Sequence, residues 1–459
     1  MSEKFDAIII GAGQGGFPAA TTFAGKGWKT ALIEREHVGG TCVNEGCTPT
    51  KTMVASARVA HLARRGGDYG VGTGSISVDM EKVRKRKRDI VESFRGGSEQ
   101  RVAATENLTL FEGQARFADN KSIEIAMRDG TTRVLDADTV IINTGASPAV
   151  PPVDGLSDVP YLDSTSIMEL GEVPEHLLVM GGGYIGLEFG QMFARFGSNV
   201  TIVNRGPRLA AREDPDVAEE VRKILTGDGA EVVLNASATA VAQTGSGAIR
   251  LAVDQDGTER VLEGSHLLVA TGRRPNTADL GLDATDVTTD KRGFIQVNDR
   301  LETGVDGVYA IGDCKGGPAF THISYADFRI VNRNLFGDGA GSIAGRLVPY
   351  AMFIDPQLGR VGMNEKEAEA AGIAYEVKKM PMEWVARALE TDEARGMMKA
   401  IIDPKSERIL GFTCLGIEGG EIAGAVQIAM MAGLPYTALR DGTFAHPTIM
   451  ESLNNLFSL

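Results

Sequence analysis

The 459-residue sequence is poor in cysteine, tryptophan and positive charge. Its four cysteines are too few for a disulfide scaffold. No histidine and cysteine cluster has the spacing of a structural zinc site, so no metal site is expected. The 47 basic residues are outnumbered by 61 acidic residues, which leaves a net charge of −14. Such an acidic surface argues against nucleic acid or an anionic membrane as a partner.

Long hydrophobic runs are also missing. No run reaches the ~18 apolar residues that a membrane helix needs, and the nearest candidate, 423–434, fits a core or interface helix better. The first apolar run, 7–10, ends at once in glycine, so no signal peptide is expected. These absences predict a cytoplasmic enzyme, and the length allows about three domains. Acidic neighbours around the basic run 84–88 favour a solvated helix face over a site for an acidic partner.

Glycine is abundant, at 57 residues, and some of it forms a dinucleotide-binding signature near the start of the chain. The predicted elements are, in order, a strand over 5–10, the G-x-G-x-x-G motif of Gly11, Gly13 and Gly16, a helix over 17–26 and a strand over 29–33. The second strand ends at Glu34, 23 residues after Gly11. Glycine permits a tight turn and close approach of a pyrophosphate, and an acid at this distance accepts hydrogen bonds from a ribose.

The same pattern recurs in the middle of the chain. Its elements are a strand over 177–180, the glycines Gly181, Gly183 and Gly186, a helix over 187–196 and a strand over 199–203. The acid is replaced here by Asn204, and Arg205, Arg208 and Arg212 follow. Arginines without the acid suit a ribose 2′-phosphate, which favours NADPH over NADH, although a solvated loop would also explain them.

Two cysteines, Cys42 and Cys47, lie five positions apart just after the first nucleotide signature. Thr48 is expected to cap a helix whose first turn contains Pro49. Because a helix N-terminus favours thiolate over thiol, the pair resembles a redox relay. Two inert cysteines are the alternative interpretation, and Cys314 and Cys414 are expected to be spare thiols.

Together these motifs resemble the flavoprotein disulfide reductases, whose members include dihydrolipoamide dehydrogenase, glutathione reductase and mercuric reductase. Further motifs that carry the resemblance lie at 143–145 (Asn-Thr-Gly), 270–276 (Ala-Thr-Gly-Arg-Arg-Pro-Asn), 309–314 (Tyr-Ala-Ile-Gly-Asp-Cys) and 446–451 (His-Pro-Thr followed by Glu451). The resemblance implies an α/β fold with two Rossmann-like dinucleotide-binding domains and a C-terminal α+β dimerisation domain. The implied ranges are 1–148 and 273–345 for FAD, 149–272 for NAD(P) and 346–459 for the interface, with a helical pair inserted at 48–105.

The resemblance also implies which residues bind the cofactors. For FAD these are Gly11, Gly13, Gly16, Glu34, Gly40, Thr41, Lys51, Thr144, Gly145 and Asp313. For NAD(P) they are Gly181, Gly183, Tyr184, Gly186, Asn204, Arg205 and Gly272. Tyr184 resembles the family's gating side chain over the nicotinamide pocket, and Lys51 is expected to pair with Glu188 near the flavin.

The implied chemistry passes electrons from NAD(P)H through FAD to the Cys42–Cys47 disulfide. Cys47 is expected to face the flavin, and Cys42 is expected to attack the substrate. His446, oriented by Glu451, is expected to serve as the acid and base for the Cys pair of the partner subunit, so that the active unit is a homodimer.

The acceptor stays open in the sequence. A small-molecule disulfide or related thiol compound is the first hypothesis, and a flavin-level reductase of metal ions, quinones or oxidants is an alternative. Mercuric reductase is a close local match, but the chain ends at 454–459 without that family's C-terminal Cys pair, so efficient mercury turnover is not expected. Dihydrolipoamide dehydrogenase is NAD-linked, which Asn204 disfavours. A flavin-loaded assembly subunit with little activity is the last alternative.

Overall fold

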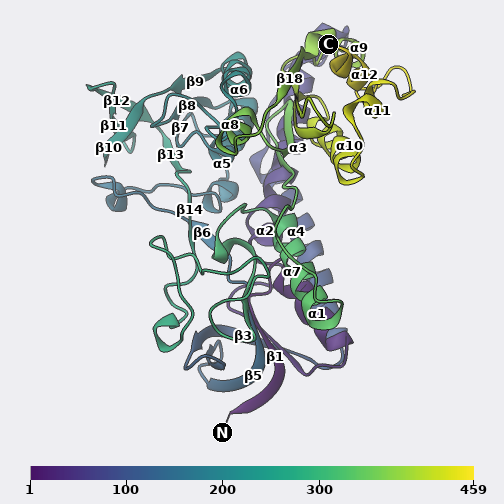
Figure 1. Ribbon diagram of the computed structural model, residues 1–459. Coiled ribbons are helices and arrows are strands. Elements are labelled where there is room, and N and C mark those ends of the chain that lie inside the picture. The colour runs from purple at the N-terminus through teal and green to yellow at the C-terminus, as the bar shows by residue number, and fades with distance from the viewer. Residues whose placement is uncertain (1) are drawn as a thin grey trace. The chain divides into compact units, whose positions relative to one another are not determined.

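The computed structural model describes residues 2–459, and the chain divides into two compact units. Unit 1 comprises Met1–Thr52, Lys85–Ala149 and Arg273–Arg346, and unit 2 comprises Met53–Arg84, Val150–Gly272 and Leu347–Leu459. The chain passes between the units within two long helices, α3 (Cys47–Arg64) and α4 (Met80–Ala104) (Figure 1). The finer division into FAD, NAD(P) and interface domains stays a prediction.

Unit 1 is built on a six-stranded sheet. Its strands are β1 (Glu3–Ile10), β2 (Thr30–Glu34), β3 (Leu108–Phe117), β4 (Ser122–Met127), β5 (Thr132–Ile142) and β15 (Val308–Ala310). The central strand β1 pairs in parallel with both β2 and β5, and Ile8 and Ile9, which point to opposite faces, are both fully buried. A strand covered on both faces is typical of an α/β sheet. Strands β6 (Ala146–Pro148) and β14 (Arg273–Pro275) form a separate two-stranded antiparallel ribbon. Strand β6 directly follows the predicted motif at 143–145, and β14 lies within the one at 270–276.

Two helices of unit 1 follow the glycine-rich turns and pack near one another, α1 (Gly16–Gly25) and α7 (Thr321–Phe336). The small side chains of α1 allow close packing on the sheet, and Phe23 fills the core they share with Phe328 of α7. A shorter helix, α2 (Gly40–Asn44), precedes α3. The loops at the carboxyl ends of the parallel strands therefore converge, which is where such sheets bind ligands.

Unit 2 contains a parallel sheet in the order β13-β7-β8-β9, an antiparallel sheet β10-β11-β12 and a five-stranded antiparallel sheet β16-β17-β20-β19-β18. The first two are formed by β7 (His176–Met180), β8 (Asn199–Val203), β9 (Ala230–Val233), β13 (His266–Val269), β10 (Ala236–Gln243), β11 (Ile249–Gln255) and β12 (Thr258–Gly264). The third is formed by β16 (Tyr350–Met352), β17 (Gln357–Gly362), β18 (Glu376–Pro381), β19 (Met397–Ile402) and β20 (Ile409–Gly416).

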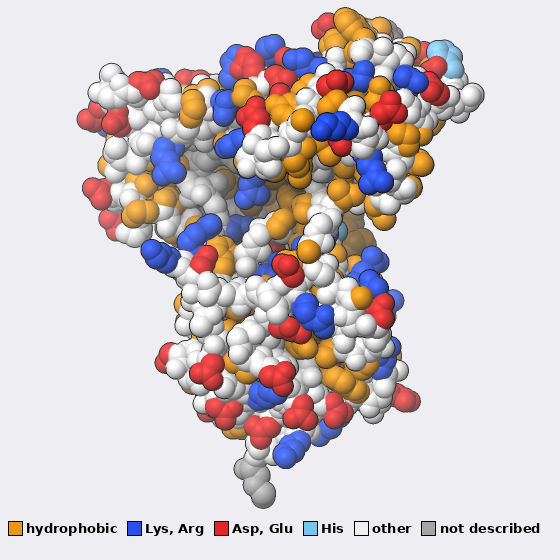
Figure 2. Space-filling view, in the orientation of Figure 1, with side chains coloured by type: hydrophobic (Ala, Val, Ile, Leu, Met, Phe, Trp, Pro, Cys, Tyr) orange, Lys and Arg blue, Asp and Glu red, His pale blue; other side chains and the backbone are white. Residues whose placement is uncertain are grey.

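The helices of unit 2 cover these sheets. They are α5 (Tyr184–Phe196), α6 (Pro215–Gly227), α8 (Glu365–Ala370), α9 (Ala386–Glu390), α10 (Gly419–Met431), α11 (Tyr436–Arg440) and α12 (Ser452–Ser458). Helix α10 is the apolar stretch expected to be a core or interface helix. Val426 packs into the core, whereas Ile428 and Met431 are each 70% exposed. Hydrophobic side chains gather on the surface around this helix (Figure 2).

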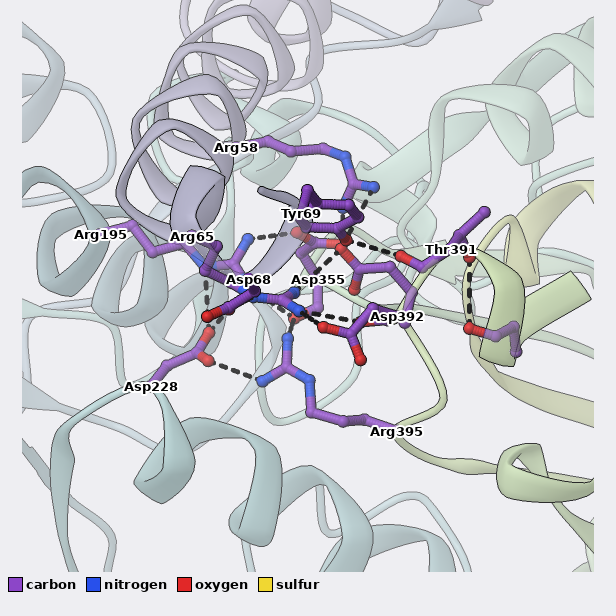
Figure 3. A network of polar contacts seen from close by, with 12 residues as sticks. Arg58, Arg65, Asp68, Tyr69, Arg195, Asp228, Asp355, Thr391, Asp392 and Arg395 are labelled. Atoms are coloured by element: carbon purple, nitrogen blue, oxygen red, sulfur yellow. Dashed lines mark hydrogen bonds and ion pairs between the residues drawn. The ribbon is translucent and has the colours of Figure 1, made fainter. Parts of the chain in front are cut away.

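A network of charged side chains ties five segments of unit 2 together (Figure 3). Arg195, near the end of α5, pairs with Asp228 at 2.9 Å and with Asp355. Arg58 of α3 also pairs with Asp355, and Arg395 pairs with Asp228 at 2.6 Å. Burial alone would raise the pKa of Asp355, but Arg195 and Arg58 hold it below its ordinary value. The network therefore joins α3, α5 and the loop before β17 by compensated buried charge.

Two local predictions are wrong. Helix α3 begins at Cys47, so Thr48 lies inside its first turn instead of before it, and the Thr50 N–H donates to the Gly46 carbonyl at 3.1 Å. The basic run is only partly a solvated face: Lys85 pairs with Asp89 at 2.7 Å on the surface, but Lys87 is buried. The helical period turns 87 toward the same side as the buried positions 83 and 91.

In the part of the chain that the structure describes, residues 2–459, no helix has both the length and the apolar character required to cross a membrane.

Candidate redox and nucleotide-binding sites

The first glycine motif forms a turn in which side chains cannot fit. Gly11 has φ +99°, and a Cβ there would lie 2.4 Å from the Asn143 carbonyl oxygen. A Cβ on Gly16 would lie 2.0 Å from the Gly11 carbonyl oxygen. Glu34 closes the turn, because Oε2 accepts from the Ala12 N–H at 2.8 Å. The carboxylate is thereby held beside the motif with lone pairs left for a ribose.

The segment after β2 packs directly on this turn. Gly39 donates its N–H to the Ala12 carbonyl at 2.9 Å. Gly40 has φ +60°, and a Cβ there would lie 2.7 Å from the Gly13 Cα. This close approach puts Thr41 and the cysteine segment next to the glycine motif, as the predicted FAD site requires.

Two sequence-distant motifs of unit 1 meet directly after β5 and β14. Asn276 donates from Nδ2 to the Thr144 carbonyl at 2.9 Å and from its backbone N–H to the Gly145 carbonyl at 3.0 Å. Asp313 lies in the turn after β15, where burial raises the pKa of its carboxyl. A partly buried acid of this kind suits a polar ligand that brings hydroxyl donors, so the residues fit the FAD that the motifs imply.

Asp327 is a site residue that the sequence analysis missed. It is fully buried on α7, accepts from the Gly312 N–H at 3.0 Å and pairs with Lys315 at 3.3 Å and Arg346 at 2.6 Å. These contacts hold the turn that carries Asp313. A carboxylate on the otherwise apolar face of a helix, 15 residues after Gly312, was the available sequence signal.

The predicted redox cysteines are together, and both are thiols. Cys42 lies in α2, and Cys47 is the first residue of α3. A hydrogen bond with Cys47, followed by burial, raises the pKa of Cys42 far above its ordinary value. The Cys47 Sγ lies 3.1 Å from Oγ1 of Thr321, the first residue of α7. Two helix N-termini thus converge on Cys47 and favour its thiolate, whereas Cys42 keeps the proton.

Thr321 was also missed, because nothing in its sequence context links it to residues 42–47. The other two cysteines are buried, and burial raises the pKa of Cys314 to about 11 and that of Cys414 to about 12. Such thiols are poor nucleophiles, consistent with their expected role as spare residues.

The second glycine motif repeats the geometry of the first. Gly181 has φ +121°, and a Cβ there would lie 2.4 Å from the Ala270 carbonyl oxygen. A Cβ on Gly186 would lie 2.0 Å from the Gly181 carbonyl oxygen, whereas one on Gly183 would meet no atom within 4 Å. The open space at Gly183 is where a pyrophosphate can approach the backbone. Gly272, with φ +140°, likewise faces open space.

Asn204 holds the position in the second motif that Glu34 holds in the first, but its hydrogen bonds differ. Its Oδ1 accepts from the Gly182 N–H at 3.2 Å, while its Nδ2 donates to the carbonyls of Gly206 at 3.0 Å and Arg208 at 2.9 Å. The amide therefore shapes the loop that carries Arg205 and Arg208, and both arginines are exposed. The loop ends in an uncompensated basic edge suited to a phosphate.

Tyr184 is the first residue of α5, directly after the glycine motif. Its hydroxyl donates to Oε1 of Glu213 at 3.1 Å, and its ring stacks on Tyr350 with 5.4 Å between centroids. Glu213 and Tyr350 were not among the predicted site residues. Glu213 lies in the 212–215 segment that resembles mercuric reductase, but nothing in the sequence links it or Tyr350 to the Tyr184 side chain.

The predicted lysine and glutamate pair belongs to two different units. Lys51 lies half-buried in the first turn of α3, in unit 1. Glu188 is buried on α5 in unit 2, where Oε1 accepts from the Phe353 N–H at 2.8 Å. Their pairing stays a prediction.

The C-terminal dyad is formed. His446 Nδ1 lies 2.9 Å from Oε2 of Glu451. The histidine side chain is 68% exposed. A glutamate on Nδ1 orients the ring and leaves Nε2 for proton transfer at the surface. An exposed acid–base pair in a single chain is suited to act on a second molecule.

One acidic group has ligand atoms close enough for a metal ion, at Asp214, Asp216 and Glu365. Lys399 already lies among them, with Nζ 2.9 Å from Asp214, 3.0 Å from Asp216 and in contact with Glu365. The ammonium group supplies the positive charge that a metal would bring.

Comparison with models of protein families shows which family the chain belongs to. Residues 5–327 match the model described as pyridine nucleotide-disulphide oxidoreductase, and residues 348–457 match the model of that family's dimerisation domain. The chain belongs to the pyridine nucleotide-disulphide oxidoreductases. Membership of this family confirms the fold class and the enzyme class predicted from the motifs. The family is FAD-dependent and uses a pyridine nucleotide.

Individual relatives agree with the family. The probable pyridine nucleotide-disulfide oxidoreductase RclA of Escherichia coli (strain K12) is 39% identical over 467 aligned positions, covering 100% of this chain and 99% of the relative. Mercuric reductase of Streptomyces lividans is 35% identical, covering 98% of this chain and 94% of the relative. Mercuric reductase of Staphylococcus aureus is 34% identical, covering 98% and 81%.

Solved structures of the HOCl-induced flavoprotein disulfide reductase RclA from Escherichia coli are also similar. One has a TM-score of 0.89 at 38% identity and covers 99% of both chains. Its Cu(II) complex has a TM-score of 0.90 at 37% identity and also covers 99% of both chains. This disulphide oxidoreductase therefore shares both sequence and fold with a characterised flavoprotein class over its whole length.

Proposed function

We propose that this oxidoreductase uses NAD(P)H to reduce its Cys42–Cys47 disulfide and passes the electrons to a small disulfide-type acceptor. Bound FAD would accept a hydride from the nicotinamide and supply an electron pair to the disulfide. The observation that carries the proposal is Cys47 at the start of α3, 3.1 Å from Thr321 at the start of α7, with Cys42 hydrogen-bonded to it. The two termini stabilise the Cys47 thiolate that opening of the disulfide leaves behind.

The chain's own residues then complete the exchange. Cys42 first gives its proton to the partner subunit's His446 and then, as thiolate, attacks the acceptor disulfide, which forms a mixed disulfide and releases one thiolate. The partner subunit's His446, held by the partner subunit's Glu451, gives that leaving thiolate its proton. The Cys47 thiolate attacks the Cys42 sulfur, which releases the second thiolate, protonated from solvent, and restores the Cys42–Cys47 disulfide. The homodimer and a cytoplasmic location belong to this proposal; the dimerisation domain supports the homodimer.

NADPH is the proposed reductant. Two features of one loop support this choice. Asn204 carries no charge to repel a phosphate, and Arg205 and Arg208, which follow it, are exposed. An acid at this place would instead favour the two free ribose hydroxyls of NADH. Comparison of kcat/KM for NADPH and NADH measures this preference directly.

A second candidate function is the reduction of a metal ion. It is favoured by the mercuric reductases among the relatives and by the Cu(II) complex of RclA. A thiol and thiolate pair such as Cys42 and Cys47 is a suitable soft ligand set for such ions. Quinones and oxidants are further acceptors to test. The Cys42→Ser variant separates disulfide reduction from direct reduction of quinones or oxidants by the flavin, because only disulfide reduction needs Cys42.

The first experiment is an anaerobic titration of the FAD-loaded protein with NADPH and, separately, with NADH, followed by its visible spectrum. A long-wavelength thiolate-to-flavin charge-transfer band is the expected result, and it should vanish in Cys47→Ser. Flavin bleaching without that band in the unmodified protein would contradict the role given to Cys47. The control is Cys414→Ser, which changes a buried thiol far along the sequence in β20.

A further inference from the structure

The hydroxyl of Tyr184 bonds to Glu213, which belongs to a cluster of three side chains of unit 2 that the proposed electron route does not use. Glu213 Oε1 accepts from the Tyr184 hydroxyl at 3.1 Å and from the Tyr350 hydroxyl. Arg360 places Nη1 3.7 Å from Glu213 Oε2 and 3.3 Å from the Tyr350 hydroxyl oxygen. We call Glu213, Tyr350 and Arg360 the tyrosine latch.

The charged part of the latch is buried. Glu213 is 4% exposed and Arg360 is 3% exposed. Burial, reinforced by the charge of Glu213, raises the pKa of the Tyr184 hydroxyl, and the same two causes raise that of Tyr350. Both hydroxyls therefore remain protonated and act as donors. A hydrogen bond to a buried charged acceptor is among the stronger ones in a protein.

The latch also fixes the ring of Tyr184. Its plane is inclined by 29° to that of Tyr350, in a stacked arrangement. Tyr184 directly follows Gly183, beside which a Cβ would meet no atom within 4 Å. Glu213 and Tyr350, from two other segments of unit 2, thus hold the ring next to the open space beside Gly183.

We propose that Glu213 is a positioning residue that holds Tyr184 in its resting place, so that binding of the nicotinamide half of the dinucleotide must break the bond between Tyr184 and Glu213. The inference rests on the proposed function and on the predicted place of Tyr184 over the nicotinamide pocket. The adenosine half, seated by Gly183 and the Asn204 loop, binds without disturbing the latch.

The test compares a whole dinucleotide with a fragment that lacks nicotinamide. Oxidised, FAD-loaded protein is titrated with NADP⁺ and with 2′,5′-ADP, or with NAD⁺ and ADP if the unmodified protein prefers NAD⁺. In Tyr184→Phe the ring and its stacking remain while the bond to Glu213 is lost. We expect the Kd for the dinucleotide to fall about tenfold and the Kd for the fragment to change less than about twofold.

Two further variants sharpen the result. Glu213→Gln removes the charge but keeps an acceptor, and it should lower the dinucleotide Kd in the same direction by a smaller factor. Tyr375→Phe is the matched control, because its hydroxyl also donates to a carboxylate, Glu369, at 2.9 Å, but on the surface. It should leave both dissociation constants unchanged.

The outcomes are distinguishable. An unchanged or raised dinucleotide Kd in Tyr184→Phe overturns the latch, and so does an equal fall for the fragment. If the unmodified protein binds neither dinucleotide, the proposed function fails instead. Should Glu213→Gln not fold, Tyr184→Phe still decides, because that substitution removes only a hydroxyl.

Discussion

The two glycine-rich motifs, one in each unit, have nearly the same backbone and different final residues. A Cβ on Gly11 or on Gly181 would lie 2.4 Å from a carbonyl oxygen of a neighbouring strand's end. Glu34 and Asn204 each accept from a backbone N–H of their own turn, at 2.8 Å and 3.2 Å. The steric demands of the glycine-rich turn are therefore common to both motifs, while the charge of the residue predicted to meet a ribose differs.

The largest expected effects come from placing a side chain at the first glycine of each turn. Gly11→Ala and Gly181→Ala each force a side chain into left-handed backbone against a carbonyl, at a local cost of about 3–6 kcal/mol. Gly11→Ala should lose FAD, whereas Gly181→Ala should keep FAD and lose NAD(P)H binding. Flavin content and dinucleotide titration measure the two losses. Gly25→Ala is the control, because a Cβ there meets nothing within 4 Å. Equal flavin loss in both variants would show that the motifs are not independent.

Next come the buried carboxylates that hold each unit together. Asp355→Ala leaves Arg195 without one of its partners in unit 2, and Asp327→Ala does the same to Arg346 in unit 1. Each should lower the free energy of unfolding by about 3–5 kcal/mol, measured by denaturant titration. Asp327→Ala should also weaken FAD retention, since Asp327 holds the Gly312 turn. Loss of FAD in Asp355→Ala alone would reverse this assignment.

The same Asp355 predicts a pH dependence. Its folded pKa lies below the ordinary aspartate value, so its contribution is complete above the ordinary pKa and is lost as the pH falls through the folded pKa. The unfolding free energies of the unmodified protein and Asp355→Ala should therefore converge as the pH is lowered from about 7 to about 3. A difference that stays constant would show that packing, not charge, accounts for the effect.

A substitution with a smaller expected effect should shift the nucleotide preference from NADPH toward NADH. Asn204→Asp keeps an acceptor for Gly182 but removes the amide donor and adds negative charge beside a 2′-phosphate. We expect kcat/KM for NADPH to fall about tenfold, with that for NADH nearly unchanged. Steady-state kinetics with both nucleotides give the ratio. Arg250→Ala, an exposed arginine paired with Glu263, is the control. An equal fall for both nucleotides would mean that Asn204 only supports the loop.

The smallest effect concerns the cysteine pair, which the first site has and the second lacks. Thr321→Val removes the hydroxyl 3.1 Å from the Cys47 Sγ, and loss of a hydrogen bond to the thiolate should move the appearance of the charge-transfer band to higher pH. Thr321→Ser should restore the original pH dependence. The pH titration of the charge-transfer band measures the shift. An unchanged titration in Thr321→Val would leave the helix termini as the source of thiolate stabilisation.

Local sequence predicted the nucleotide units because their constraints are local. The strand, turn and helix around Gly11, and again around Gly181, follow from glycine spacing and hydrophobic period alone, and the structure confirms them. Local reasoning failed where a contact decides the outcome. Thr48 is a good capping residue, yet the helix starts one residue earlier, at Cys47, and Lys87 is buried although it lies in a basic run.

The sequence by itself determined the two glycine-rich turns, the neighbouring cysteine pair and the family, because short-range sterics and residue chemistry specify them. Only the tertiary structure decided what surrounds them. Thr321 lies 274 positions from Cys47 along the chain, and Tyr350 lies far from the Tyr184 on which it stacks. No periodicity or spacing encodes such contacts, since they arise when separate elements pack around a common core.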